Sequence, residues 1–71
     1  MAKKKAVTTP THVVVIEMYD GSATKILRCA NEGSAIELFE SEGAEGRGDV
    51  ALCTFDSSDP EGIGTMIRSL P

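Results

Sequence analysis

The pattern of hydrophobic and polar positions predicts three β-strands. Residues 11–19 and 23–29 are rich in β-branched residues, and Asp20-Gly21 between them is typical of a tight hairpin turn. Residues 13–16 are apolar at every position, so we expect this first strand to be central, with both faces at least partly covered. A further apolar segment, residues 49–56, predicts the third strand.

A helix is predicted between the second and third strands. Asn31 is a suitable N-terminal cap, because its side chain can accept hydrogen bonds from the first-turn amides. Gly43 is expected to supply the left-handed residue that ends the helix. Between them lies an apolar stripe at helical spacing, made up of Ala35, Ile36, Leu38 and Phe39.

The C-terminal segment predicts a second helix. Asp59 is expected to cap it, with Pro60 at its first helical position. The apolar residues that follow fall at positions i, i+3, i+4 and i+7, which is the spacing of one helical face. These residues are Ile63, Met66, Ile67 and Leu70.

The predicted elements give an α+β fold of the order β-β-α-β-α. A right-handed crossover through the first helix gives a three-stranded sheet of order 2-1-3, with strands 2 and 3 parallel and both helices on one face. We expect one small α+β domain over residues 11–71, preceded by a flexible basic tail at residues 1–10.

Two helices on one face leave the other face of such a sheet without a cover. The first-strand residues expected under the helices are Val14, Ile16 and Met18. Those expected on the uncovered face are Val13, Val15 and Tyr19. An exposed apolar face marks a surface for a partner or for self-association more often than it marks nothing.

Composition and charge narrow the function. Seventy-one residues with 41% apolar and 25% charged side chains indicate one globular domain with a thin margin of stability. The net charge of −4 combines +3 in residues 1–30, −5 in residues 31–49 and −2 in residues 50–71. Duplex binding depends on cations that neutralise phosphates, so the acidic middle of the chain disfavours direct contact with nucleic acid. It is either a solvated helix face or a surface that docks onto a basic groove of a partner.

Catalytic and metal-binding patterns are sparse. His12 is the only histidine, and Cys29 and Cys53 are 24 positions apart, which is neither a redox C-x-x-C motif nor zinc-ligand spacing. We expect two buried free thiols and a solvated histidine. A pairing of His12 with either cysteine stays open at this level.

The tripeptide Arg47-Gly48-Asp49 matches an adhesion motif of secreted proteins. Residues 8–12 stand where a signal peptide needs an apolar segment, and no apolar run is long enough to cross a bilayer, so we expect a cytoplasmic protein. The tripeptide is accordingly interpreted as a flexible, charged connection before the third strand.

These observations predict a small non-enzymatic protein-binding module without a metal or cofactor. In size and acidity the chain resembles small phage- or mobile-element-encoded inhibitors that occlude a larger machine, including some that block restriction or RNA-guided nucleases. The resemblance covers size and charge and no motif, and it implies a partner with a basic groove. The expected electrostatic surface consists of Glu37, Glu40, Glu42, Glu45 and Asp49, and the expected apolar surface of Val13, Val15 and Tyr19.

Two alternatives of different class remain. One is a homodimeric structural or accessory domain that associates through the uncovered sheet face. The other is a thiol-based redox protein, which requires a cysteine of lowered pKa.

Overall fold

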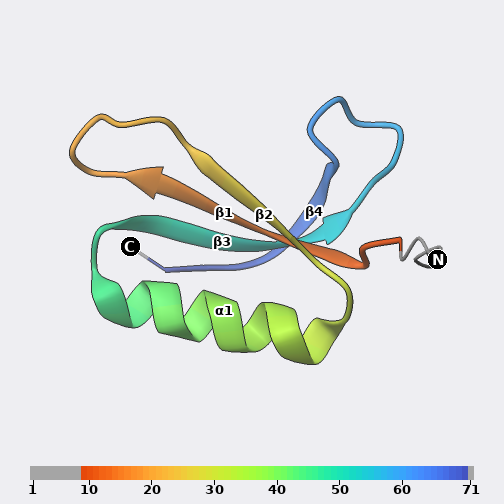
Figure 1. Ribbon diagram of the computed structural model, residues 1–71, viewed down its shortest axis with the longest axis horizontal. Coiled ribbons are helices and arrows are strands. Elements are labelled where there is room, and N and C mark those ends of the chain that lie inside the picture. Colours follow the sequence, from red (N-terminus) through yellow and green to blue (C-terminus); the bar gives the residue numbers. More distant parts are fainter. Residues whose placement is uncertain (1–8, 71) are drawn as a thin grey trace, which may run out of the picture.

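Residues 9–70, which the computed structural model describes, form a four-stranded antiparallel sheet and one helix. The chain order is β-β-α-β-β and the strand order in the sheet is β2-β1-β3-β4 (Figure 1). The elements are β1 (His12–Met18), β2 (Lys25–Cys29), α1 (Glu32–Glu45), β3 (Gly48–Phe55) and β4 (Ile63–Leu70).

The predicted three-stranded sheet with two helices is wrong, because residues 63–70 form β4 and not a second helix. The first three strands do lie in the order 2-1-3, with β1 central and antiparallel to both neighbours. The C-terminal apolar residues have helical spacing in the sequence, but they lie in a strand whose pairing with β3 is irregular. Cys53 pairs with Met66 while Leu52 pairs with Arg68, so Ile67 is an extra residue in the ladder.

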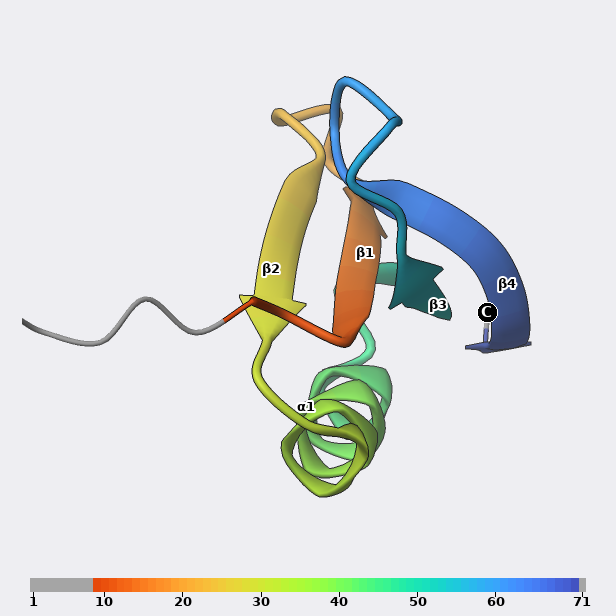
Figure 2. The ribbon, with the colours of Figure 1, turned by 90° about the vertical axis from the view of Figure 1, so that its right-hand side faces the viewer.

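A second irregularity follows between Cys53 and Phe55, and together the two bend β4 away from a flat sheet (Figure 2). The β-branched residues Ile63, Thr65 and Ile67 alternate along this segment, which is the strand signal that competes with the helical spacing.

The predicted cap at Asp59 belongs to the β3–β4 loop instead. The carboxylate oxygen Oδ2 of Asp59 accepts hydrogen bonds from the amides of Glu61 and Ile63, at 2.9 and 3.1 Å. The amide of Asp56 donates to the carbonyl of Gly62 at 2.9 Å and closes the loop. Asp59 therefore has the expected capping chemistry, but it stabilises a turn between strands.

Helix α1 begins as predicted and ends later. The Asn31 side chain accepts a hydrogen bond from the Ser34 amide at 2.8 Å, and Glu32 lies in the first turn, where a negative charge is favourable. The helix passes Gly43 and ends at Gly46, whose φ of 71° is left-handed. The prediction that Gly43 ends the helix is therefore wrong, because Gly46 provides the same conformation one turn later.

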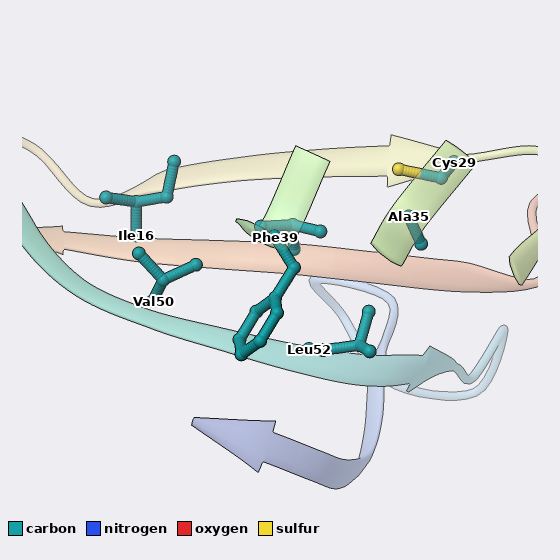
Figure 3. Close-up of a cluster of buried hydrophobic side chains, with 7 residues drawn as sticks. Ile16, Cys29, Ala35, Phe39, Val50 and Leu52 are labelled. Carbon is teal, nitrogen blue, oxygen red and sulfur yellow. The ribbon is translucent and has the colours of Figure 1, made fainter. Parts of the chain in front are cut away.

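The core lies between α1 and one face of the sheet. Phe39 and Ala35 are buried against Ile16, Val50 and Leu52, and the Phe39 ring lies over β3 in Figure 3. Met18, Leu27, Ile36 and Leu38 pack around this cluster. The expected apolar stripe of the helix and the expected inward set of β1 are thus confirmed.

The second face of the sheet, away from α1, is covered at one end by the β3–β4 loop. Arg28, the cross-strand neighbour of Val13, donates from its guanidinium to the Glu61 carbonyl at 2.9 Å. The ring of Phe55 lies against Gly62 in the same loop. Val13 is consequently fully buried, and the prediction that it is part of an exposed apolar surface is wrong.

Residues 1–8 lie outside the described part of the chain, and with them most of the predicted basic tail. Of that tail, Thr9 is exposed and Pro10 is half-buried.

Candidate functional site

The other end of the second face is hollow. Antiparallel register places Val15 opposite Ala51, and Cys53 opposite Met66, so these four side chains share one side of the sheet. With Ile63 they line a hollow of about 390 Å³ between β1, β3 and the bent β4. We call this the sheet hollow and define it by Val15, Ala51, Cys53, Ile63 and Met66.

Two carboxylates stand at the sheet hollow. Glu17 on β1 is the direct register partner of Asp49 on β3, and both line the hollow and are exposed. Like charges directly opposite one another on antiparallel strands destabilise a sheet. Within residues 9–70 neither carboxylate has a salt-bridge partner, because the ion pair found there joins Arg47 to Glu45 at 3.0 Å.

Tyr19 lies beside this carboxylate pair. Its hydroxyl donates a hydrogen bond to Oδ1 of Asp49 at 2.7 Å, while 60% of the residue remains exposed. The hydrogen bond to Asp49 is the main cause of a raised Tyr19 pKa, followed by desolvation and the negative charge of Asp49. Val15, Asp49 and Tyr19, three of the predicted partner-binding residues, are therefore brought together at one end of the second face.

Tyr19 is the only tyrosine of the chain, so ultraviolet absorbance reports its titration directly. We expect its midpoint to lie above that of a free tyrosine and to fall in Asp49→Asn, because the phenolate form loses the hydrogen bond and faces a carboxylate. Because the folded-state pKa of Tyr19 is raised, the stability that its contact with Asp49 contributes is present below the pKa of the unfolded state. That contribution is lost as the pH rises through the pKa of the folded state.

Asp56→Asn serves as the charge-matched control for that titration, since Asp56 makes its hydrogen bonds to Ser58 in the β3–β4 loop. Equal midpoints in wild type and Asp49→Asn would show that the contact between Tyr19 and Asp49 does not form in solution.

The predicted acidic surface of α1 lies on the opposite side of the molecule from the sheet hollow. Glu37 and Glu40 are exposed and point away from the buried side of the helix, as expected; we call these two residues the acidic helix face. Glu42 is half-buried, and Glu45 is exposed but paired with Arg47. The expected electrostatic surface is thus not continuous. Its four glutamates lie on α1, whereas Asp49 lies at the sheet hollow on the other face of the sheet.

The tripeptide 47–49 is not a flexible loop tip. Gly48 and Asp49 are the first residues of β3, and Gly48 is buried opposite Met18. A Cβ at Gly48 would collide with the carbonyl of Glu17, so glycine is needed here for close approach of two strands. The predicted flexible connection is therefore wrong for Gly48, which already pairs with Met18, while Asp49 lies in β3 as the predicted strand over residues 49–56 requires.

The two cysteines lie on opposite faces of the sheet. Cys29 belongs to the core beneath α1, whereas Cys53 lines the sheet hollow. Both thiols are free and buried, and desolvation raises the pKa of each. Raised values are opposite to those of reactive thiols, and side chains on opposite faces of one sheet cannot join in a disulfide.

His12 is the register partner of Cys29, so the structure brings together one of the two pairings left open by the sequence. The imidazole Nδ1 lies 2.7 Å from the hydroxyl oxygen of Thr11, while the Cys29 sulfur lies 3.9 Å from the Leu27 carbonyl. No hydrogen bond in the described residues joins the ring to the thiol, so the structure does not show the His–Cys contact by which a base activates a nucleophile.

The edges of the sheet differ. Strand β2 has five residues and carries Lys25 and Arg28, which is typical of an edge protected against pairing. Strand β4 has eight residues with a single charge, and three of its side chains are large, apolar and exposed. They are Met66, Ile67 and Leu70, at 59%, 47% and 39%.

Sequence reasoning missed Glu17, Ala51, Cys53, Ile63 and Met66 as neighbours in one site. The alternation of Asp49, Ala51 and Cys53 along β3 was a signal for the part of the hollow made by the first three strands. Ile63 and Met66 could not be placed at the hollow from the sequence, because the apolar spacing of residues 63–70 predicts a helix.

Residues 9–70 contain no cluster of three or more His, Cys, Asp or Glu side chains in a position to hold a metal ion. The one helix of this region lacks the length and hydropathy needed to cross a membrane.

Comparison with protein-family models, with curated proteins and with solved structures finds no match to this chain. A functional assignment therefore rests on the chemistry of the surfaces described above.

Proposed function

We propose that this chain is a non-enzymatic, cytoplasmic protein-binding module that recognises a basic surface of a larger protein and occludes it. The partner class that fits is a nucleic-acid-processing machine, since such proteins carry cationic grooves for phosphates. Inhibitors of restriction or RNA-guided nucleases encoded by phages or mobile elements act in this way, and the chain resembles them in size and acidity.

The observation that carries this proposal is the excess of uncompensated negative charge. Residues 9–70 contain eleven Asp or Glu side chains against four Lys or Arg, and one side-chain ion pair. On the acidic helix face, Glu37 and Glu40 are exposed and take part in no ion pair within these residues. Such a surface attracts a cationic partner during encounter and repels wrong ones.

Removal of the helix charges should weaken binding without unfolding the protein. In the triple variant Glu37→Gln, Glu40→Gln and Glu42→Gln, we expect about tenfold weaker affinity for the partner, since each exposed charge pair contributes about 0.2–1 kcal/mol. The partner is first captured from the native host and identified by mass spectrometry, and its dissociation constant is then measured by calorimetry with purified proteins.

The charge-matched control neutralises three acidic residues of the two loops, which lie outside α1: Asp20→Asn, Asp56→Asn and Glu61→Gln. Unchanged affinity in the triple helix variant, with wild-type thermal stability, would remove the acidic helix face from the proposal.

A homodimeric accessory domain is the second candidate, and the exposed β4 edge favours it. An apolar edge strand of this length can pair with the same strand of a second copy and extend the sheet. Light scattering at high micromolar concentration separates the two candidates, because a strictly monomeric protein rules out the dimer. The thiol-based alternative loses support from the burial and raised pKa of both cysteines.

A further inference from the structure

We infer that the sheet hollow is the docking site for an extended segment of a partner protein, in which an apolar side chain enters the hollow beside a Lys or Arg that meets Glu17 and Asp49. This inference rests on the proposed protein-binding function and adds to it a second contact surface, on the face of the sheet opposite α1.

The shape and lining of the hollow fit an apolar side chain. Of the five residues that define the hollow, Cys53 is the most buried, at 4% exposed, and Val15, Ala51 and Ile63 are half-buried. Met66 is 59% exposed at the hollow and has a flexible side chain that can adapt to what enters. Burial of such a surface by a partner is favourable by about 25 cal/mol per Å² of apolar area.

The charges at the hollow select the partner. Glu17 and Asp49 face each other across β1 and β3 and have no cationic neighbour in the described chain that forms an ion pair with them. Their mutual repulsion is relieved when one cation lies between them. The hydrogen bond from Tyr19 holds Asp49 in place, so a Lys or Arg of the partner meets a carboxylate whose position is already set.

Charge complementarity also disfavours the other occupants. Nucleic acid and anionic lipid bring negative charge to a pair of carboxylates. A second copy of this chain brings a net charge of −4, from eleven acidic and seven basic side chains. The occupant that fits is a cationic polypeptide with an apolar residue next to the charge. Its apolar side chain matches the lining of the hollow, and its positive charge matches Glu17 and Asp49.

A titration with synthetic peptides, followed by NMR of the isotope-labelled protein, tests this inference. The probe is an end-blocked eight-residue peptide that carries one leucine between two lysines. Two control peptides replace the leucine by alanine or the lysines by glutamates. We expect saturable shifts at the methyl groups of Val15, Ala51, Ile63 and Met66 at up to millimolar peptide, and loss of these shifts with either control peptide.

Two variants test the two carboxylates and the apolar lining of the hollow separately. Glu17→Gln with Asp49→Asn should weaken binding of the lysine peptide about fivefold, whereas Ala51→Leu should fill the hollow and abolish the methyl shifts. Glu32→Gln with Glu61→Gln is the charge-matched control, because these exposed residues neither line the hollow nor belong to the acidic helix face, and it should leave peptide affinity unchanged.

Each remaining outcome overturns the inference in a recognisable way. Shifts confined to α1 would remove the hollow and leave the proposed function in place. Absence of shifts with all three peptides would also remove the hollow, while the affinity of the helix variants for the isolated partner tests the proposed function independently. Shifts in the hollow that depend on protein concentration alone would assign it to a second copy.

Discussion

Replacement of Phe39 by alanine is expected to lower the free energy of unfolding by about 3–5 kcal/mol. Phe39 is 2% exposed and packs against both β1 and β3 residues of the core (Figure 3). A chain of this size has a stability of the same order, so most of the Phe39→Ala protein should be unfolded at physiological temperature. Urea denaturation followed by circular dichroism measures the effect.

Two further variants make this result interpretable. Phe39→Leu keeps an apolar side chain and should remain folded with a smaller loss, while Glu40→Ala, the next residue on the exposed side of α1, should change stability by no more than about 0.5 kcal/mol. A Phe39→Ala protein with the wild-type urea midpoint would mean that α1 does not pack on the sheet through this ring.

The second large effect is expected at Gly48. Gly48→Ala should lower the free energy of unfolding by about 1–3 kcal/mol, because the new methyl group would collide with backbone atoms of Glu17 and Met18 on the neighbouring strand. A backbone neighbour cannot rotate away as a flexible side chain can. The strand pairing at this end of the sheet would have to open, and with it the alignment of Glu17 with Asp49.

Gly33→Ala is the matched control for Gly48→Ala. Gly33 lies in the first turn of α1, where an added Cβ makes only an ordinary contact of 3.5 Å with the Asn31 side chain. The same chemical change should there be neutral or stabilising by up to about 1 kcal/mol. Equal and small effects at both positions would show that the pairing of β1 with β3 is looser at this end than the structure indicates.

The first three strands and α1 follow from local signals in the sequence. The apolar run in β1 predicts a central strand, and Asn31 marks the start of the helix by its own side-chain chemistry. Strand β4 could not be predicted in the same way. Its pairing with β3 is irregular at Ile67 and between Cys53 and Phe55, and its apolar residues have a spacing that a helix also produces. Such irregularities depend on the partner strand, so they cannot be recognised from the sequence of β4 alone.

The candidate site was predictable only in part for the same reason. Val15, Asp49 and Tyr19 were identified as surface residues, but their proximity depends on the pairing of β1 with β3. The burial of Val13 depends on the β3–β4 loop and on Arg28, which are distant from it in sequence. Glu37 and Glu40 could be assigned to the exposed face of α1 because that assignment needs only the helical period.

Recognition of a cationic protein by exposed carboxylates is the central claim, and the rate of association tests it most directly. Stopped-flow measurements with the isolated partner should be made over a series of sodium chloride concentrations. We predict an association rate constant that falls steeply as salt rises and is lower at low salt in the triple glutamine variant of Glu37, Glu40 and Glu42. A rate constant that is independent of salt and equal in both proteins would contradict the account.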